Sequence, residues 1–342
     1  MTITFTGDKF ESSERVFTNC FSHDRAFADF AGNYGFPGKS IVEVFGPKSH
    51  GKTTYCLSLM AMMAKTWQKN TTIMDWEGQS RDTIEGVFPH QGFFGNVEYI
   101  LQRQPKTKKD KGETSEETAE RFLATIHDED RNIALFDSIG GFIPTAYSEG
   151  EIGDANMGVF AREIGRLTSK IKQVIISAET PGAVFMTNHE HPKIGSFVGG
   201  SETAGGVRKK YLSHVRIQVG KYFGGKKSPV SGYVSLDDGW LLKGKVENNR
   251  YGYSGREFSV WMVGGEGIHV GMTALFDCVL LGIAKLSAKK VSESNTVSLD
   301  GNNYGKLGYI MEHRNDDPDF FSPFINALRE NEMEEVEDDS QG

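Results

Sequence analysis

The chain contains 342 residues, of which 38% are hydrophobic and 25% charged, a composition typical of a globular protein. No apolar run approaches the ~20 residues that a membrane-spanning helix needs, and the first residues lack a basic region followed by an apolar core. Three widely spaced cysteines without a CxxC pair argue against a disulfide framework and against a zinc site. We therefore expect a protein of the cytoplasm with no membrane partner.

The net charge of −8 is concentrated near the C-terminus. Six carboxylates lie between Glu332 and Asp339, which leaves about −2 for the rest of the chain. This distribution excludes a histone-like mode of DNA binding but permits a local basic groove. We expect residues 331–342 to form a disordered acidic tail, either a solvated terminus or a competitor of polyanions for a basic site.

A glycine-rich loop follows the first strongly apolar run of the chain. Residues 41–45 are predicted to form a buried strand and residues 56–65 a helix, joined by Gly46-x-x-x-x-Gly51-Lys52-Thr53. Such a loop aims backbone N–H groups at an anion, which favours a phosphate-binding loop over a glycine-rich turn that happens to carry a lysine. Lys52 would reach the β- and γ-phosphates of a nucleotide, and the Thr53 hydroxyl would coordinate Mg²⁺. The expected nucleotide contacts in the loop are Gly46, Pro47, Lys48, Ser49, His50, Gly51, Lys52, Thr53 and Thr54.

Apolar runs and helix-like segments alternate after this loop. The pattern predicts an α/β fold with a mostly parallel twisted sheet and helices on both faces. Residues 233–263 contain several strand-like pieces, typical of antiparallel edge strands, and the lysine-rich stretch 106–112 is interpreted as a solvated loop rather than a DNA contact. The predicted strands are 71–75, 97–101, 133–137, 183–187 and 214–219, and the predicted helices are 116–128 and 159–177.

The C-terminal part predicts a small α/β lobe. Residues 274–287 are a candidate amphipathic helix and residues 320–332 a second helix, with 303–308 interrupting them. We therefore divide the chain into an N-terminal segment 1–35, a core 36–269, a lobe 270–330 and the tail 331–342.

Acidic residues follow two of the predicted strands. Asp137 ends the strand 133–137, where a carboxylate would hold the hydration shell of Mg²⁺, although a simple turn residue is the alternative. Glu77 follows the strand 71–75, which we expect to lie beside the loop strand. Glu77 is the candidate general base for water attack, with Asp75 as the second candidate.

Asn188 and His189 follow the strand 183–187 in the same way. Ligands of open α/β sheets lie at the carboxyl ends of the strands, so these two residues should meet Lys52, Thr53, Glu77 and Asp137 at one edge. Asn188 is a candidate nucleotide contact. His189 is either a structural histidine or a sensor of the γ-phosphate that moves the following loop.

Two loops are longer and richer in glycine than simple connections require. They cover residues 149–158 and 190–207, and the second is associated with the basic residues His191, Lys193 and Arg208. Backbone amides and a few cations suit binding of a phosphodiester backbone without reading its sequence. The alternative for both loops is an active-site lid.

These motifs together resemble bacterial RecA recombinases and the UvsX-type recombinases of tailed phages, over residues 36–267 and more weakly beyond. The loop from Gly46 to Thr54 is similar to the RecA phosphate loop, and Phe136-Asp137-Ser138 to its second acidic motif. The segment 149–158 resembles the first DNA-binding loop of RecA nearly residue for residue, and 205–216 resembles the helix and strand after the second. The pair Asn188-His189 replaces the Asn-Gln of RecA and resembles the phage proteins, which favours a phage origin.

The resemblance implies a helical filament on DNA, with ATP and Mg²⁺ held between adjacent protomers. Lys52, Thr53, Asp137 and Glu77 would act within one protomer, while Lys245 or Arg250 would reach the γ-phosphate of a neighbour. Tyr211 corresponds to an aromatic residue that couples subunits, Arg250 would also lie at that interface, and residues 1–35 would serve oligomerisation. The expected partners are single-stranded DNA, homologous duplex DNA, and single-stranded-DNA-binding and mediator proteins. The DNA-contact candidates are Met157, Gly158, Arg162, Lys193, Phe197, Thr203, Gly205, Gly206 and Arg208.

Three functions remain open at this point. The resemblance favours a DNA-dependent ATPase that forms filaments on single-stranded DNA and promotes homologous pairing and strand exchange. A ring-forming helicase motor would use the same core but does not carry the 149–158 segment. A nucleotide-switched DNA-binding or mediator protein would hydrolyse little ATP, which a catalytic Glu77 argues against.

Overall fold

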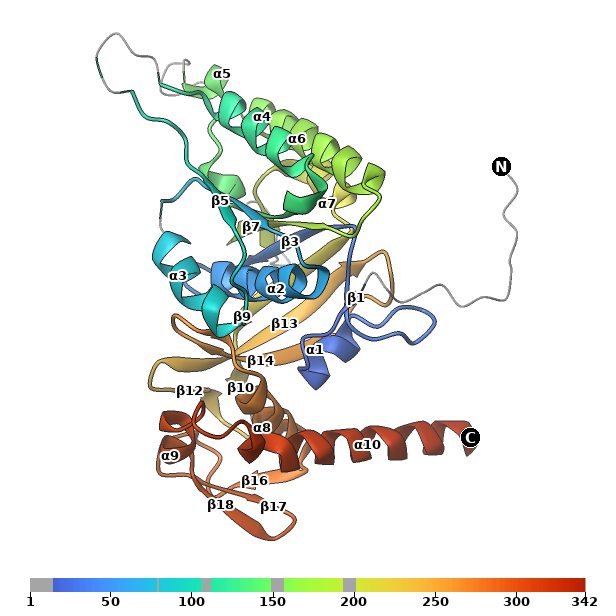
Figure 1. Cartoon of the computed structure of the whole chain (residues 1–342). Helices are drawn as coiled ribbons and strands as arrows, with labels where there is room; N and C mark the ends of the chain where they lie inside the picture. The colour runs from blue at the N-terminus through green and yellow to red at the C-terminus, as the bar shows by residue number, and fades with distance from the viewer. Residues whose placement is uncertain are drawn as a thin grey trace.

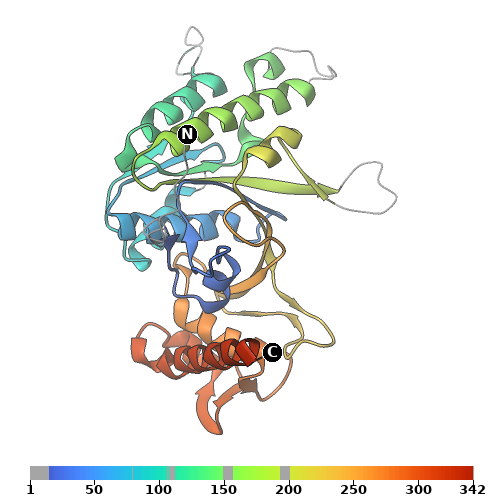
Figure 2. The same cartoon turned by 90° about the vertical axis from the view of Figure 1, so that its right-hand side faces the viewer.

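The computed structural model of the chain describes residues 15–78, 80–105, 107, 112–148, 157–192 and 201–341. A large α/β core carries a smaller lobe formed by the C-terminal part of the chain, drawn in orange and red (Figure 1). The second view shows helices on two sides of the core sheet and the lobe below it (Figure 2).

One twisted sheet forms the centre of the core. Six neighbouring strands run parallel, and antiparallel strands extend the sheet from β9 outward. The expected fold class, with an antiparallel edge after residue 233, is confirmed. The strand order is β15 (Gly267–Ile268), β14 (Glu257–Val263), β13 (Gly239–Asn249), β9 (Val215–Lys221), β3 (Ser40–Gly46), β7 (Ala183–Pro192), β6 (Ile133–Asp137), β4 (Thr71–Asp75) and β5 (Val97–Ile100), with β12 (Ser235–Leu236) on β13 and β8 (Ser201–Thr203) on β7.

This order corrects one expectation. The strand that precedes Glu77, β4, does not lie beside the loop strand β3, because β7 and β6 are inserted between them. Crossover connections set the neighbours of a parallel strand, and apolar patterning does not encode them. The carboxyl ends of these strands nevertheless share one edge.

Helices cover both faces of the sheet. Alternate residues of β3 belong to different clusters: Val42 and Val44 pack toward α2, whereas Ile41 packs toward α4 and α6. A strand buried on both sides needs a continuous apolar run, which is what its sequence shows. The helices of the core are α2 (Lys52–Trp67), α3 (Ser80–His90), α4 (Ser115–Ile126), α5 (Thr145–Ser148), α6 (Met157–Ser177) and α7 (Gly206–Leu212), with short 3-10 turns at Glu129–Arg131 and Ile139–Gly141.

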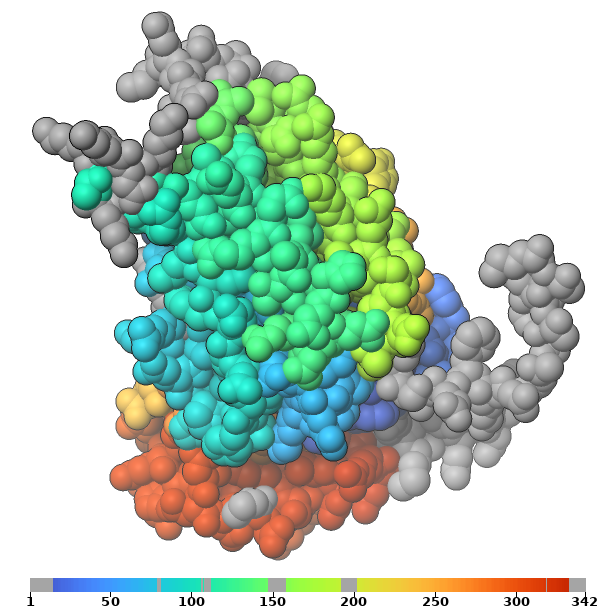
Figure 3. Space-filling model, turned by 45° about the horizontal axis from the view of Figure 1, so that its top comes forward, coloured from blue at the N-terminus to red at the C-terminus, as the bar shows by residue number. Residues whose placement is uncertain are grey.

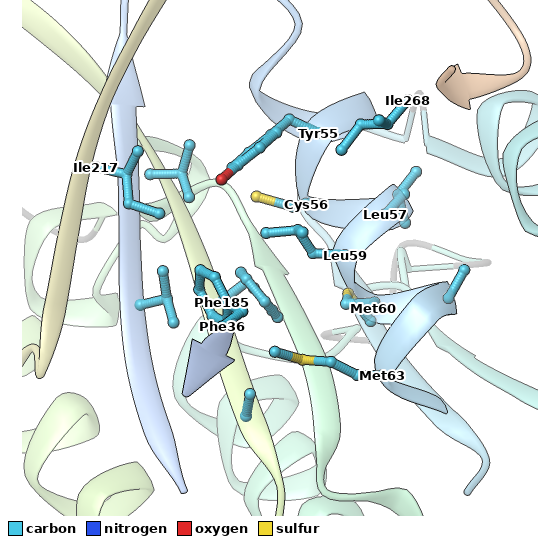
Figure 4. Close-up of a cluster of buried hydrophobic side chains, with 14 of the residues drawn as sticks. Phe36, Tyr55, Cys56, Leu57, Leu59, Met60, Met63, Phe185, Ile217 and Ile268 are labelled. Atoms are coloured by element: carbon cyan, nitrogen blue, oxygen red, sulfur yellow. The ribbon is translucent and has the colours of Figure 1, made fainter. Parts of the chain in front are cut away.

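The larger cluster lies between α2 and the sheet. Tyr55, Leu59 and Met63 of α2 point toward the strands that carry Phe185 and Ile217, and all are buried (Figure 4). Full burial of one such side chain contributes about 1.5–3 kcal/mol, so this layer fixes where the phosphate loop ends and α2 begins. On the other face, α4 and α6 lie side by side and form a continuous outer surface (Figure 3).

The N-terminal segment packs against the same layer. It contains β1 (Arg15–Val16), α1 (Phe21–Ala26) and β2 (Phe36–Pro37), and β1 pairs with β2. His23 is fully buried, and its Nε2 atom lies 2.8 Å from the hydroxyl of Tyr55 on α2. Residues 15–37 are therefore part of the core layer, in addition to any role between subunits.

The C-terminal lobe differs from its predicted elements. The helix expected at 274–287 is α8 (Val270–Leu281), which ends at Gly282 in a left-handed conformation with φ +82°. It is buried along most of its length, with Phe276 stacked on Trp261 at 4.6 Å, so it lacks the expected amphipathic pattern. The remaining elements are β10 (Phe223–Gly224), β11 (Gly232–Tyr233), β16 (Ala284–Leu286), β17 (Thr296–Leu299), β18 (Asn302–Lys306), α9 (Leu307–Glu312), a 3-10 turn (Pro318–Phe321) and α10 (Ser322–Gln341).

The last helix, α10, corrects the expected chain end. It continues to Gln341, whereas the sequence predicted a helix end near Glu332 and disorder beyond it. Glutamate and glutamine are good helix formers, so a run of like charge did not by itself end the helix. Within the described ranges, no helix is long and apolar enough to cross a membrane.

His214, between α7 and β9, makes stability depend on pH. The residue is 5% exposed, and its Nδ1 atom accepts a hydrogen bond from the Ile41 backbone N–H at 3.2 Å. Burial, followed by the charges of Lys172 and Arg250, lowers the pKa of His214 from 6.5 to about 4. The unfolded chain therefore takes up this proton first as the pH falls, so stability present above pH 6.5 is lost between pH 6.5 and 4.

We predict that the free energy of unfolding falls by about 2 kcal/mol through His214 between pH 7 and pH 5. Urea unfolding of the wild type and of His214→Asn at both pH values measures this difference, because asparagine keeps an acceptor but does not titrate. Parallel declines in the two proteins would show that His214 is not held neutral in the folded state.

Candidate functional site

The loop between β3 and α2 has a backbone that requires glycine at both ends. Gly46 has φ +155°, and a Cβ there would lie 2.0 Å from the Val219 carbonyl oxygen. Gly51 has φ +84°, and a Cβ there would lie 3.0 Å from the Trp240 ring. The loop therefore packs directly on β9 and β13, and α2 begins immediately after it without a side-chain cap, so the N–H groups of its first turn can bind an anion. Trp240 was not predicted as a support of this loop, since nothing in its sequence context links it to residue 51.

Lys52 is 7% exposed, and its ammonium group donates to the carbonyl oxygens of Gly46 at 3.1 Å and Pro47 at 2.7 Å. Burial lowers the pKa of Lys52, and the carboxylates of Asp137 and Glu77 oppose that shift. A lysine held at the loop by weak carbonyl acceptors is suited to exchange them for phosphate oxygens. The loop residue His50 accepts a hydrogen bond from the Lys221 backbone N–H at 3.1 Å, which ties the loop to β9.

Thr53 and Asp137 form the expected pair. The Thr53 hydroxyl donates to Asp137 Oδ2 at 2.8 Å, and the Thr187 hydroxyl donates to the other carboxylate oxygen. Asp137 is 6% exposed, and burial raises its pKa, with Glu77 and Asp75 raising it further. A hydroxyl and a buried carboxylate are hard oxygen donors, and a divalent cation would offset the cost of that buried charge. The donor set therefore fits Mg²⁺.

Glu77 and Asp75 occupy different environments although they are two residues apart. Asp75 is 1% exposed, and its oxygens accept from the N–H groups of Glu77 and Gly78 and from the Tyr99 hydroxyl at 2.6–2.8 Å. The Glu77 side chain is 40% exposed, and its Oε1 atom accepts from the Ser138 hydroxyl at 2.9 Å. Asp75 therefore organises the turn, while Glu77 remains accessible to a water molecule.

His189 joins this edge through sheet register. It pairs with Gly46 across β7 and β3, and its Nε2 atom lies 3.6 Å from Glu77 Oε1. Asn188 behaves differently from its predicted role as a nucleotide contact. It is fully buried, and its side-chain N–H₂ donates to Glu43 and to the Ala204 carbonyl, each at 2.9 Å. This places Asn188 in a link between β3 and the segment after β8.

Much of the chain is similar to known proteins. A family model described as the RecA N-terminal domain matches residues 9–236, about two thirds of the chain. The chain belongs to the RecA family. It is 32% identical over 186 residues to the protein RecA of Bacillus velezensis and of Bacillus subtilis, covering 54% of this chain and 49% of each relative. It is 30% identical over 210 residues to the protein RecA of Bacillus thuringiensis, covering 61% and 57%. The chain thus spans about half the length of the curated relatives it matches.

Membership in the RecA family confirms the expected fold. The residues matched by the family model include the phosphate loop, Glu77, Asp137 and His189. Lys245 and Arg250 lie beyond the matched residues. Lys245 on β13 pairs with Glu247 at 2.8 Å. Arg250 is exposed, and its guanidinium donates to the carbonyl oxygen of Tyr211, a residue that is itself 71% exposed. The structure therefore brings together the two interface candidates Tyr211 and Arg250.

The DNA-contact candidates of this RecA-family chain fall into three groups. Arg162 is exposed on α6, and Met157 and Gly158 begin that helix. Thr203 is 8% exposed, and its hydroxyl accepts from Lys209, so it does not present a polar group to a surface ligand. Lys193 and Phe197, with the segments 149–156 and 193–200, lie outside the described residues.

Arg208, Gly205 and Gly206 have structural explanations in the described part of the chain. The Arg208 guanidinium donates to Ser169 on α6 at 3.2 Å, and its side chain crosses Gly165. Gly205 and Gly206 have φ +90° and +75°, and a Cβ on either would lie within 2.9 Å of an α6 side chain. These three residues hold α7 against α6, which positions the end of the second loop without requiring direct contact with DNA.

Proposed function

We propose that the chain is a DNA-dependent ATPase that forms helical filaments on single-stranded DNA and promotes homologous pairing and strand exchange. The observation that carries the proposal is the meeting of Lys52, Thr53, Asp137, Glu77 and His189 at one sheet edge. ATP with Mg²⁺ is the proposed cofactor, because the loop offers an anion site and Thr53 and Asp137 offer hard oxygen ligands.

In this mechanism each residue has a separate task. Lys52 and the loop N–H groups bind the phosphates, and Thr53 and Asp137 hold the cation. Glu77 removes a proton from the attacking water, and the Ser138 hydroxyl orients its carboxylate. His189 lies between Glu77 and the start of the second loop, so it can respond to the γ-phosphate and bias the loop.

The second half of the site belongs, in this proposal, to the next protomer. Arg250 is the better candidate for the residue that acts in trans, because it lies beside the exposed Tyr211, whereas Lys245 is paired with Glu247. Single-stranded DNA, homologous duplex DNA and single-stranded-DNA-binding and mediator proteins are the proposed partners, in a cytoplasm. Phage origin rests on His189 alone and stays a prediction.

Electron microscopy with single-stranded DNA and a non-hydrolysable ATP analogue, together with ATP turnover assays, tests the function. We expect open helical filaments and turnover that rises at least about tenfold on addition of single-stranded DNA. Closed rings would favour the helicase motor instead. Turnover that is absent or independent of DNA would favour a nucleotide-switched binding protein.

A further inference from the structure

A fully buried ionic cluster connects the nucleotide strand to the end of the second loop. Glu43 on β3 is 0% exposed, and its carboxylate accepts from Lys209 of α7, from Asn188 of β7 at 2.9 Å and from Arg216 of β9 at 2.7 Å. Lys209 is also 0% exposed. An acidic residue within an apolar strand was the sequence signal for this cluster, but its partners are distant in the chain.

The same donors reach the far side of the second loop. The Lys209 ammonium also donates to the Thr203 hydroxyl at 3.1 Å, and the Asn188 amide also donates to the Ala204 carbonyl at 2.9 Å. Thr203 ends β8, which pairs with β7 through Glu190. Two cluster members therefore each bond both to Glu43 and to the chain where it leaves β8.

The cluster is also connected directly to the proposed nucleotide site. Glu43 lies three residues before Gly46 on the same strand, and Asn188 Oδ1 accepts the backbone N–H of His189 at 2.9 Å. His189 in turn faces Glu77. The Asn188 side chain therefore joins the backbone of His189 to the carbonyl of Ala204, so a shift of the β7 backbone at His189 acts on both.

The charge balance argues for a defined arrangement of these groups. Burial acts to raise the pKa of Glu43, but the charges of Lys209 and Arg216 bring it below its ordinary value. Burial lowers the pKa of Lys209 to about 8 against the opposing effect of Glu43. Buried polar networks of this kind have few alternative arrangements, which suits a two-state element.

We propose that Lys209 and Glu43 are positioning residues that couple nucleotide binding at the phosphate loop to DNA affinity at the second loop. The proposal rests on the proposed function, because it presumes that both ligands bind. Both side chains are fully buried, so neither is placed to contact a ligand. Their effect is on the coupling between the two sites, which is reciprocal for binding free energies.

Lys209→Met in the full-length protein tests the coupling. This change leaves Glu43 balanced by Arg216, so the variant should fold. Anisotropy of a fluorescent oligo-dT measures DNA affinity with and without a non-hydrolysable ATP analogue, and a fluorescent ATP analogue measures nucleotide affinity with and without DNA. We expect affinity for the nucleotide alone within about twofold of wild type, while both coupling ratios fall by the same factor, about tenfold or more.

Lys69→Met is the matched control. Lys69 is 9% exposed, and its ammonium donates to Asn132 at 2.9 Å and Thr180 at 2.7 Å, near the amino ends of β6 and β7. The Lys69→Met variant loses a comparable buried cation at the opposite edge of the sheet. We therefore expect it to have a lower melting temperature but unchanged coupling ratios for DNA and for nucleotide. A purely structural role for Lys209 would make the two variants behave alike.

The outcomes separate the two proposals. A wild type whose DNA affinity does not respond to the analogue overturns the proposed function and this inference together. A responsive wild type with unchanged ratios in folded Lys209→Met overturns the inference alone. If Lys209→Met does not fold, Thr203→Val replaces it, because this change removes only the hydrogen bond from Lys209 to Thr203. Unchanged coupling ratios in that variant would equally overturn the inference.

Discussion

Glu77→Gln is expected to abolish ATP turnover while leaving nucleotide-dependent assembly intact. Glutamine has nearly the shape of glutamate and can still accept the Ser138 hydrogen bond, but it cannot take a proton from water. Loss of a positioned general base lowers turnover by about 10²- to 10⁴-fold. Phosphate release with single-stranded DNA measures turnover, and electron microscopy with ATP measures assembly. We expect the filaments of this variant to persist in ATP, because the hydrolysis that would release them no longer occurs.

Asp75→Asn is the informative comparison. Its carboxylate is enclosed by the backbone N–H groups of Glu77 and Gly78 and by the Tyr99 hydroxyl. We expect this variant to lose thermal stability and to lose turnover only in proportion to its unfolded fraction. If a folded Asp75→Asn protein is inactive and Glu77→Gln turns over ATP normally, the general base has been assigned to the wrong carboxylate.

The sequence predicted correctly the bounds of those elements whose apolar pattern fits only one type of secondary structure. Strands 71–75 and 133–137 match the structure at both ends, because each is a short buried run closed by a polar residue. β7 extends to Pro192 rather than ending at residue 187, because its pairing with β8 satisfies backbone groups that patterning cannot reveal. The α8 helix was misplaced because a helix buried on nearly all sides has no polar face from which to read its period.

The site was predicted in its outline but not in its connections. Residues at strand ends meet because parallel strands share an edge, so Asp137, Glu77 and His189 followed from their positions alone. The orientation of Asn188 did not follow, since the adjacent residues of a strand face opposite sides and Glu43 competes for its amide. Partners that are distant in the chain, such as Lys209 and Glu43, become visible only when β3, β7 and α7 are placed together.

Lys52→Ala is expected to remove nucleotide-dependent assembly. Lys52 provides the buried cation of the loop, and charge-assisted hydrogen bonds contribute about 1.5–3 kcal/mol each, so nucleotide affinity should fall by about 10- to 100-fold or more. Fluorescent-nucleotide titration and electron microscopy measure the two losses. Lys65→Ala, at the exposed end of the same helix α2, is the control and should bind and assemble as the wild type does.

Mixing variants tests whether the site is shared between protomers. A Lys52→Ala protomer keeps Arg250, and an Arg250→Ala protomer keeps Lys52, so a junction is complete where the Arg250→Ala protomer supplies the phosphate loop and the Lys52→Ala protomer supplies Arg250. Head-to-tail contacts place such junctions throughout a filament. The mixture should therefore recover turnover that neither variant shows alone, in proportion to roughly a quarter of junctions if assembly is random. Recovery of turnover only when Lys245→Ala replaces Arg250→Ala in the mixture would instead assign the trans role to Lys245. If neither mixture recovers turnover, the whole ATPase site lies within one protomer.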